Sequence, residues 1–252
     1  MNSFIPWIGG KKLLRKAILA EFPPMNTVSR YIEVFGGAGW VLFAKETIPS
    51  QMEVINDIDG NLVNLYRCIK YHCGELQREL DGYLVSREQF FDCKAQLDMR
   101  GLTDIQRAAR YYVLIRTSFG ADQRTFGTHR KNLVGSIDYL PEIKERLKHV
   151  LLENKDCTDL VKVYDRPDAL FYLDPPYLGA EQHYSFAFGM DDHQRLRDCL
   201  TRIKGKFILS YNNEPFIKEL YAGFNIIEVE RNNNLVKTAG APKYKEVIIK
   251  NF

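Results

Sequence analysis

The chain has 252 residues, of which 45% are hydrophobic and 27% are charged. This is the composition of a globular protein, and it excludes the disordered and fibrous classes. The formal net charge of +3 is too small to indicate a nucleic-acid partner by itself. No apolar run approaches the ~20 residues of a membrane-spanning helix, and the N-terminal residues lack the pattern of a signal peptide, so we expect no membrane partner.

The five cysteines are scattered and lack the close pairing of a zinc site or a disulfide framework. We therefore expect reduced thiols, a cytoplasmic location and no metal. Cys68 and Cys73 lie on an expected helix with His72 beside Cys73. Metal binding is open there, but ordinary packing is the simpler interpretation.

Apolar spacing and turn residues divide the first part of the chain into alternating helices and strands. They predict, in chain order, a helix over residues 11–22, a strand over 31–35, a helix over 40–46 and a strand over 52–55. Asp59 is a candidate N-cap for a further helix. The pattern then becomes helical and polar from about residue 73 to 147, with an irregular loop or loose hairpin over residues 117–137.

Strand patterns return in the last part of the chain. They cover residues 150–153, 169–173, 206–210, 224–229 and 246–249. A helix around Leu196, between the expected strands over residues 169–173 and 206–210, has Asp191 or Asp192 as its expected cap. Because the last two strands have no helix between them, we expect them to pair as an antiparallel edge hairpin.

Strands that alternate with helices predict an α/β fold with a mixed, mostly parallel sheet covered on both faces. We expect residues 1–72 and 148–252 to form this domain, and residues 73–147 to be a helical insert. Two independent domains would leave an N-terminal sheet of two strands, which is too small to be stable alone.

A glycine-rich turn joins the first expected strand to a helix. It reads Phe35-Gly36-Gly37-Ala38-Gly39, and Asp57 follows the next strand. Glycines let a ligand approach the backbone closely, the helix N-terminus offers free N–H groups, and an acid about 20 residues beyond such a turn typically binds ribose hydroxyls. This pattern indicates a nucleoside cofactor. A plain tight turn and a helix-capping role for Asp57 remain the alternatives.

A second motif, Asp174-Pro175-Pro176-Tyr177, follows an apolar strand. Two prolines fix the backbone and remove two N–H donors, so the Asp174 carboxylate and the Pro175 carbonyl can both accept hydrogen bonds from an exocyclic amino group. Tyr177 offers a ring on which a base can stack. The alternative is a rigid strand exit with a structural tyrosine.

In this order the motifs resemble those of the Dam-like, alpha-class DNA adenine N6-methyltransferases. Residues 174–177 are similar to the amino-methylation tetrapeptide of that family, and residues 31–39 are similar to its cofactor loop. Residues 4–11, Phe-Ile-Pro-Trp-Ile-Gly-Gly-Lys, resemble its N-terminal motif. Residues 55–57 resemble its acidic motif, and residues 154–157 resemble the pair that contacts the cofactor adenine, with Cys157 in place of the usual Phe.

The resemblance implies a Rossmann-like methyltransferase fold with S-adenosylmethionine as the methyl donor and no metal. Asp57 would bind the cofactor ribose, and Asp156 would bind its adenine amino group. The cofactor residues implied in this way are Trp7, Gly10, Lys11, Phe35, Gly36, Gly37, Gly39, Asp57, Asp156 and Cys157. Lys11 as a solvated charge is the alternative for that residue, because Lys12 is next to it.

The catalytic residues would be Asp174, Pro175, Pro176 and Tyr177. If Asp174 and the Pro175 carbonyl accept both hydrogens of the target amino group, its nitrogen lone pair is freed for in-line attack on the methyl group. A base inside a duplex cannot be reached, so it would have to be flipped out, and stacking on Tyr177 would return ~1–3 kcal/mol of that cost. The predicted partner is double-stranded DNA, and the resemblance leaves a cognate restriction enzyme open.

The insert would contact the DNA. Residues 116–135 carry four basic residues and one acid, and Arg can bind guanine while Asn can bind adenine. Resemblance implies a target-recognition domain with a protruding hairpin at about residues 116–137, and a cofactor pocket built from the other domain. The expected DNA-binding residues are Arg116, Arg124, Arg130, Lys131, Asn132 and Tyr184. A solvated loop is the alternative for the basic residues, and a core aromatic is the alternative for Tyr184.

Other functions compete with DNA adenine methylation. Methylation of RNA adenine or of the cytosine N4 amino group uses the same tetrapeptide chemistry. A non-catalytic DNA-binding protein on the same scaffold is a further alternative, although both motifs are intact. Cytosine C5 methylation is disfavoured, because it uses a Cys nucleophile that usually follows Pro, and no cysteine here does. A bacterial or phage-infected cell is the expected setting.

Overall fold

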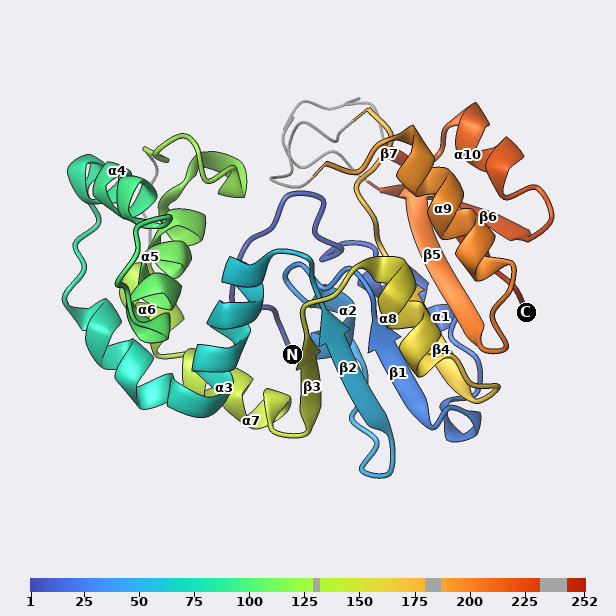
Figure 1. The fold of residues 1–252 in the computed structure, drawn as a ribbon, viewed down its shortest axis with the longest axis horizontal. Coiled ribbons are helices and arrows are strands. Elements are labelled where there is room, and N and C mark those ends of the chain that lie inside the picture. Colours follow the sequence, from blue (N-terminus) through green and yellow to red (C-terminus); the bar gives the residue numbers. More distant parts are fainter. Residues whose placement is uncertain (129–131, 180–186, 232–243) are drawn as a thin grey trace.

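The computed structural model describes residues 1–128, 132–179, 187–231 and 244–252. Three of the expected DNA-binding residues, Arg130, Lys131 and Tyr184, lie outside the described residues. The described part contains one seven-stranded sheet, and a group of helices lies beside it (Figure 1).

Each strand pattern in the sequence corresponds to one strand of the sheet. The strands are β1 (Arg30–Glu33), β2 (Met52–Asn56), β3 (Val150–Glu153), β4 (Ala169–Leu173), β5 (Lys206–Asn212), β6 (Asn225–Arg231) and β7 (Tyr244–Lys250). Their spatial order is β3-β2-β1-β4-β5-β7-β6. The first five strands in this order are parallel, and β7 is antiparallel to both β5 and β6. The expected α/β sheet with an antiparallel pair at its edge is therefore confirmed.

Helices cover both faces of the sheet, which is why its central strand is apolar throughout. All five residues of β4 are buried. Ala169, Phe171 and Leu173 pack into one hydrophobic cluster, and Leu170 and Tyr172 pack into the other. The first cluster includes residues of α8 (Cys157–Tyr164), α9 (Met190–Leu200) and α10 (Pro215–Leu220), and the second includes residues of α1 (Arg15–Ala20), α2 (Trp40–Ala44) and α3 (Gly60–Asp81). A strand that is buried on both sides needs such a continuous apolar run.

The helices beside the sheet come from the middle of the chain (Figure 1). They are α4 (Arg87–Gln96), α5 (Asp104–Thr117), α6 (Leu133–Ile137) and α7 (Leu140–Leu147), with a short 3-10 turn at Phe119–Ala121. A second 3-10 turn, Met25–Thr27, precedes β1 in the N-terminal part of the chain. Helix α3 leads from the sheet into this group and departs from helical geometry at His72, with φ −133° and ψ 37°. This break lies at the expected boundary between residues 72 and 73.

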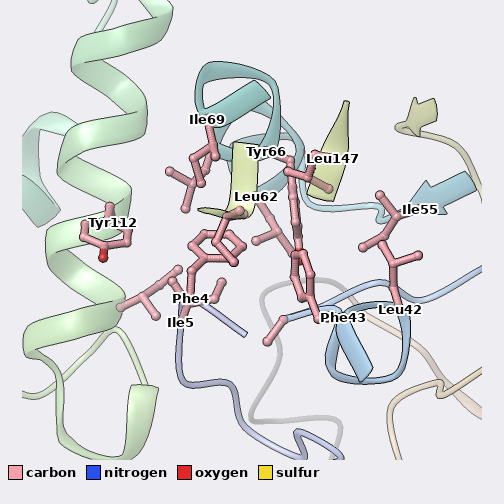
Figure 2. Packing of buried hydrophobic residues seen from close by; sticks show 14 of the residues in the cluster. Phe4, Ile5, Leu42, Phe43, Ile55, Leu62, Tyr66, Ile69, Tyr112 and Leu147 are labelled. Atoms are coloured by element: carbon pink, nitrogen blue, oxygen red, sulfur yellow. The ribbon is translucent and has the colours of Figure 1, made fainter. Parts of the chain in front are cut away.

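One hydrophobic core nevertheless extends across that boundary (Figure 2). Phe4 from the N-terminal segment packs edge-on against Phe43 of α2 and Tyr66 of α3, with ring centroids 6.1 Å and 5.3 Å away. Tyr112 of α5 and Leu147 of α7 belong to the same cluster. Division of the chain into residues 1–72 with 148–252, and 73–147, therefore stays a prediction.

Three local expectations need correction. Residues 117–127 form the expected loose hairpin, with an antiparallel bridge between Ser118 and Phe126. The irregular stretch does not extend to residue 137, however, because Asn132 caps the short helix α6 by accepting a hydrogen bond from the Gly135 N–H at 2.9 Å. Helix α9 begins after Gly189, and Asp192 supports that start by accepting from the Gly189 N–H at 2.9 Å rather than acting as the N-cap itself. Helix α1 starts at Arg15, not at residue 11, which leaves Lys11 in a turn.

Candidate active site

The site lies where the parallel strands end. Strands β1, β2 and β4 run side by side in the same direction, so the segments that follow them meet at one edge of the sheet. These segments carry the glycine turn, Asp57 and Asp174. Ligands of open parallel sheets bind at this edge.

The glycine turn after β1 has a shape that only glycine tolerates. Gly37 has φ +47°, in the left-handed region, and a Cβ there would lie 2.8 Å from Nε1 of Trp7. A Cβ at Gly36 would lie 2.6 Å from Cγ1 of Ile55 on the neighbouring strand. Trp7 and Gly37 are thus packed in close contact, and the N-terminal motif forms a wall of the site beside the turn.

Asp57 fastens the glycine turn, and Asp59 caps the helix. The Gly37 N–H donates to Oδ2 of Asp57 at 2.8 Å, and the Asp59 N–H donates to Oδ1 at 2.9 Å. Asp59 accepts from the Asn61 N–H at 2.8 Å as the N-cap of α3, as expected. Burial raises the pKa of Asp57 to about 6, although the two N–H donors oppose that shift. A carboxylate so placed can still accept hydrogen bonds from a ligand, because each oxygen has a second lone pair.

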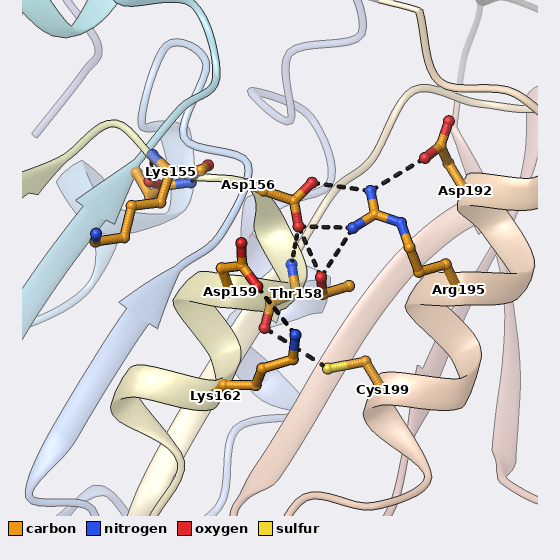
Figure 3. A network of polar contacts seen from close by, with 9 residues as sticks. Lys155, Asp156, Thr158, Asp159, Lys162, Asp192, Arg195 and Cys199 are labelled. Carbon is orange, nitrogen blue, oxygen red and sulfur yellow. Dashed lines mark hydrogen bonds and ion pairs between the residues drawn. The ribbon is translucent and has the colours of Figure 1, made fainter.

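Asp156 stands at the start of α8 and forms an ion pair with a residue of α9 (Figure 3). The Arg195 guanidinium donates to both carboxylate oxygens, at 2.7 Å and 2.8 Å, and also contacts Asp192 at 3.0 Å. The N–H and hydroxyl of Thr158 donate to Asp156 Oδ1 as well. Arg195 holds the pKa of Asp156 well below its usual range, so this carboxylate stays ionised. The bidentate pairing fixes its orientation toward the site.

Asp174 lies at the end of β4 with a lysine and a serine on one of its oxygens. Nζ of Lys11 is 2.8 Å from Oδ1, and the Ser210 hydroxyl donates to the same oxygen at 2.8 Å. The other oxygen, Oδ2, has no hydrogen-bond partner among the residues that the structure describes. Burial raises the pKa of Asp174, the Lys11 ammonium and the Ser210 hydroxyl lower it, and Glu246 raises it. Asp174 therefore keeps an acceptor for a donor that enters the site.

The remaining tetrapeptide residues lie around Asp174. Pro176 lines the same pocket as Asp174. Tyr177 donates a short hydrogen bond from its hydroxyl to Glu246, and Lys11 lies over its ring at 4.6 Å from the centroid. Burial raises the pKa of Tyr177 well above its ordinary value, with the charges of Asp174 and Glu246 adding to the effect, so the phenol stays neutral.

A single pocket brings the expected cofactor residues together with Asp174. Every one of the ten residues named for the cofactor lines it: Trp7, Gly10, Lys11, Phe35, Gly36, Gly37, Gly39, Asp57, Asp156 and Cys157. Asp174 and Pro176 line it too, while Pro175 and Tyr177 are not part of its wall. The pocket therefore connects the glycine turn after β1 to the tetrapeptide after β4. The individual roles of these residues stay predictions.

The insert also contributes to this pocket, which corrects the expectation that the other domain builds it alone. Ala121, Asp122, Gln123 and Arg124 all line it. Ala121 and Gln123 have positive φ values of 64° and 57°, and Asp122 accepts hydrogen bonds from the N–H groups of Arg124 and Thr125 at 2.9 Å and 3.0 Å. A tightly turned segment of the insert thus reaches the cofactor end of the site.

The other described residues expected to contact DNA have partners within the protein. Arg116 donates to the backbone carbonyls of Phe4 and Asn132, both at 3.4 Å. The Asn132 side chain caps α6. Neither residue lines the pocket. Both side chains thus have a structural role within the protein, and the DNA-binding roles of Arg116 and Asn132 stay predictions.

Sequence reasoning missed several residues of the site, four of which contact its carboxylates or the tetrapeptide. Arg195 and Asp192 are three residues apart on α9 and look like an ordinary surface ion pair. Ser210 and Glu246 contact the tetrapeptide from β5 and β7. Glu246 had one detectable signal, because it is a charged residue directly before the apolar run Val-Ile-Ile of an expected strand.

The described residues contain neither a metal-binding cluster nor a membrane-spanning helix. No cluster of three or more His, Cys, Asp or Glu side chains there could hold a metal ion. Cys68 and Cys73 are buried free thiols in the hydrophobic core. No helix in the described ranges combines the length and the apolar character needed to cross a membrane.

Known proteins resemble the chain over almost all of its length. The family described as D12 class N6 adenine-specific DNA methyltransferase matches residues 7–235. The type II methyltransferase M1.LlaDCHI of Lactococcus lactis subsp. cremoris is 28% identical, over 100% of this chain and 96% of that protein. The type II methyltransferase M.CviBI of Paramecium bursaria Chlorella virus NC1A is 27% identical, over 92% of this chain and 90% of that protein. A DNA adenine methylase of Haemophilus influenzae is 25% identical, over 91% of this chain and 86% of that protein.

The sheet order is typical of methyltransferases that use S-adenosylmethionine, and the glycine turn and the tetrapeptide lie at the edge of the sheet where such enzymes bind their ligands. With the family match over residues 7–235, these observations make the chain a member of the D12 class of N6 adenine-specific DNA methyltransferases, which use S-adenosylmethionine as the methyl donor.

Proposed function

We propose that this chain methylates N6 of an adenine that has been flipped out of double-stranded DNA at a specific site, and that Asp174 holds the target amino group. The observation that carries the proposal is the position of Asp174. It lies in one pocket with the glycine turn and Asp57, and its Oδ2 has no partner in the described part of the chain. An amino group that donates to this oxygen would face the cofactor end of the same pocket.

The residues present fit S-adenosylmethionine. Trp7 packs closely against the glycines of the turn, which carry no side chains, and the Asp57 carboxylate can accept from ribose hydroxyls. Asp156, held ionised by Arg195, can accept from the adenine amino group. When bound, the cofactor supplies an electrophilic methyl group on a sulfonium. No further protein group is needed to activate that methyl group.

The chain's own contribution is to position and desolvate the target nitrogen. Asp174 accepts one hydrogen of the amino group, and the Pro175 carbonyl accepts the second, which frees the nitrogen lone pair. Lys11 and Ser210 oppose the rise in the Asp174 pKa that burial causes, and so favour the ionised, accepting form of Asp174. Tyr177 provides the ring on which the flipped base stacks. This arrangement accelerates the reaction through orientation and electrostatics.

The substrate proposal has further parts. Double-stranded DNA is the inferred partner, and Arg116, Arg124, Arg130, Lys131, Asn132 and Tyr184 are its inferred contacts. A cognate restriction enzyme is consistent with the names of the two type II relatives. We place the chain in the cytoplasm of a bacterial or phage-infected cell, without a metal in the reaction.

A labelled-methyl assay tests the proposal. The protein is incubated with methyl-labelled S-adenosylmethionine and, separately, with duplex DNA, single-stranded DNA and RNA, and the products are digested to nucleosides. The expected result is labelled N6-methyladenine from duplex DNA at a fixed sequence context. Labelled N4-methylcytosine, or label mainly in RNA, would overturn it. Binding of DNA without any transfer would instead support a non-catalytic protein.

A further inference from the structure

We propose that Glu246 is a positioning residue for methyl transfer, which fixes the Tyr177 ring through its hydroxyl in the orientation on which the target base stacks. No motif of the sequence pointed to this residue. The inference rests on the proposed function, because it needs Tyr177 to be the stacking surface. It adds a residue from β7, at the far end of the chain, to the machinery around the tetrapeptide.

The backbone holds Glu246 rigidly. It lies in the middle of β7, where it is paired with Asn212 of β5 on one side and with Val229 of β6 on the other. Only 2% of the residue is exposed. A side chain on a strand that is paired on both sides has little freedom to move, so its carboxylate is a fixed point against which another group can be oriented.

Two residues of the site contact this carboxylate at the same oxygen. The Tyr177 hydroxyl donates a short hydrogen bond to Oε2 of Glu246. Nζ of Lys11, which pairs with Asp174 at 2.8 Å, is 3.9 Å from the same Oε2. Lys11 also lies 4.6 Å from the centroid of the Tyr177 ring. Glu246 thus links the stacking tyrosine to the lysine that neutralises Asp174.

Packing alone does not require an acid at this position. The next three residues of the strand, Val247, Ile248 and Ile249, are buried and apolar. A buried carboxylate is costly unless it is paired and hydrogen-bonded. Two of the contacts of Glu246, those of Tyr177 and Lys11 with Oε2, are made by residues of the site, and these contacts give the acid a role in positioning both side chains.

Loss of Glu246 would free the phenol to interfere with the reaction. Asp174 and Glu246 face the same ammonium, because Nζ of Lys11 lies 2.8 Å from Oδ1 of Asp174 and 3.9 Å from Oε2 of Glu246. The charge of Asp174 accordingly raises the pKa of Tyr177. A Tyr177 hydroxyl released from Glu246 would have Asp174 as an alternative acceptor, and it would then compete with the target amino group. Glu246 therefore does two things: it holds the plane of the ring, and it keeps the phenol proton away from Asp174.

A double-mutant cycle tests the inference with the full chain. The variants are Glu246→Ala, Glu246→Gln, Tyr177→Phe and the double variant Glu246→Ala with Tyr177→Phe. Tyr221→Phe is the matched control, because Tyr221 is a fully buried tyrosine whose hydroxyl has no hydrogen-bond partner among the described residues. Each variant is measured by single-turnover methylation of saturating duplex DNA, by titration with S-adenosylmethionine and by thermal unfolding.

We expect Glu246→Ala and Tyr177→Phe each to slow single-turnover transfer by about 10- to 100-fold, the range for loss of a hydrogen bond to a charged group. The double variant should be no slower than Tyr177→Phe alone, because both changes remove one interaction. Glu246→Gln keeps an acceptor oxygen and should remain within about threefold of the wild type. Cofactor affinity should stay within about twofold throughout, since Glu246 does not line the cofactor pocket.

Several results would overturn the inference. Wild-type rates for Tyr177→Phe or for Glu246→Ala would do so, and so would rate losses that add in the double variant. A loss that appears only in thermal stability, as Tyr221→Phe could also give, would assign Glu246 a structural role. If Glu246→Ala does not fold, Tyr177→Phe and Glu246→Gln still decide the question. Failure of the proposed function is separate, because then the wild type itself would not form N6-methyladenine.

Discussion

Lys11 and Asp174 form a buried ion pair, with 2.8 Å between Nζ and Oδ1, although one belongs to the N-terminal motif and the other to the tetrapeptide after β4. Lys11 is 5% exposed and also donates to the Gly9 carbonyl at 2.7 Å. The pair links the N-terminal motif to the tetrapeptide across the pocket. The N-terminal turn lines the pocket, and its lysine opposes the rise in the pKa of Asp174 that burial causes.

Replacement of Lys11 should therefore change the pH dependence of transfer. Burial raises the pKa of Asp174, and Lys11 is the main group that lowers it. In Lys11→Met the pKa should rise further, so Asp174 would be protonated up to a higher pH and could not accept from the target amino group. The acidic limb of the kcat profile should move to higher pH. Lys12→Met, at the exposed neighbour, is the control, and an equal shift in both variants would refute the assignment.

Asp57 should make cofactor binding depend on pH. Burial raises its pKa to about 6, so the carboxyl is protonated below that pH and loses its attraction for ribose hydroxyls. The affinity for S-adenosylmethionine should then fall as pH decreases below about 6, by up to about tenfold per pH unit. Calorimetry between pH 5 and 7 measures this. The Asp57→Ala variant should bind S-adenosylmethionine weakly at every pH, without that pH dependence. If its affinity equals that of the wild type, Asp57 serves only to hydrogen-bond the glycine turn.

Arg195 should support cofactor binding through Asp156. Its guanidinium holds both oxygens of that carboxylate, but the pair is partly exposed, so its loss should have a modest effect. We expect Arg195→Met to weaken S-adenosylmethionine binding a few-fold without a change in DNA affinity. Arg202→Met, at an exposed arginine just after α9, is the control in the same calorimetric titration. Equal affinities for the two variants would show that Arg195 only stabilises α8 against α9.

Arg124 and Arg130 should contribute to DNA binding. Replacement of both with Ala should weaken binding and lower the log–log salt slope by about 0.9 for each lost phosphate contact, or relax the choice of site if the contacts are to bases. Anisotropy titrations of a short duplex at several salt concentrations measure this. Unaltered affinity, slope and site choice would place DNA contacts elsewhere. Because Arg124 lines the pocket, Arg124→Ala should also weaken cofactor binding, contrary to the expectation from sequence.

The sequence predicts the strands and the place of the site well, because both depend on local patterns. Apolar runs such as that of β4 mark strands that are buried on both faces. The glycine turn and the tetrapeptide each follow a predicted strand, and parallel strands bring such segments to one edge. Asp57 and Asp59 could not be separated by sequence, since either acid could cap α3, and only the hydrogen bonds distinguish them.

The contacts that complete the site depend on tertiary structure and left little trace in the sequence. Glu246 reaches Tyr177 only because β7 inserts between β5 and β6 in the antiparallel direction. Arg195 reaches Asp156 because α8 and α9 pack on the same face. The insert reaches the pocket through a turn with positive φ at Ala121 and Gln123, which non-glycine residues seldom adopt and sequence patterns do not predict.

The central claim is that Asp174 accepts the target amino group, and its most direct test is the single-turnover rate of N6-methyladenine formation by Asp174→Ala. The enzyme is first saturated with S-adenosylmethionine and duplex DNA, so only the transfer step is measured. We predict a loss of at least about 100-fold, with cofactor affinity and thermal unfolding close to those of the wild type. A rate within a few-fold of the wild type would contradict the account, because the amino group would then be activated elsewhere.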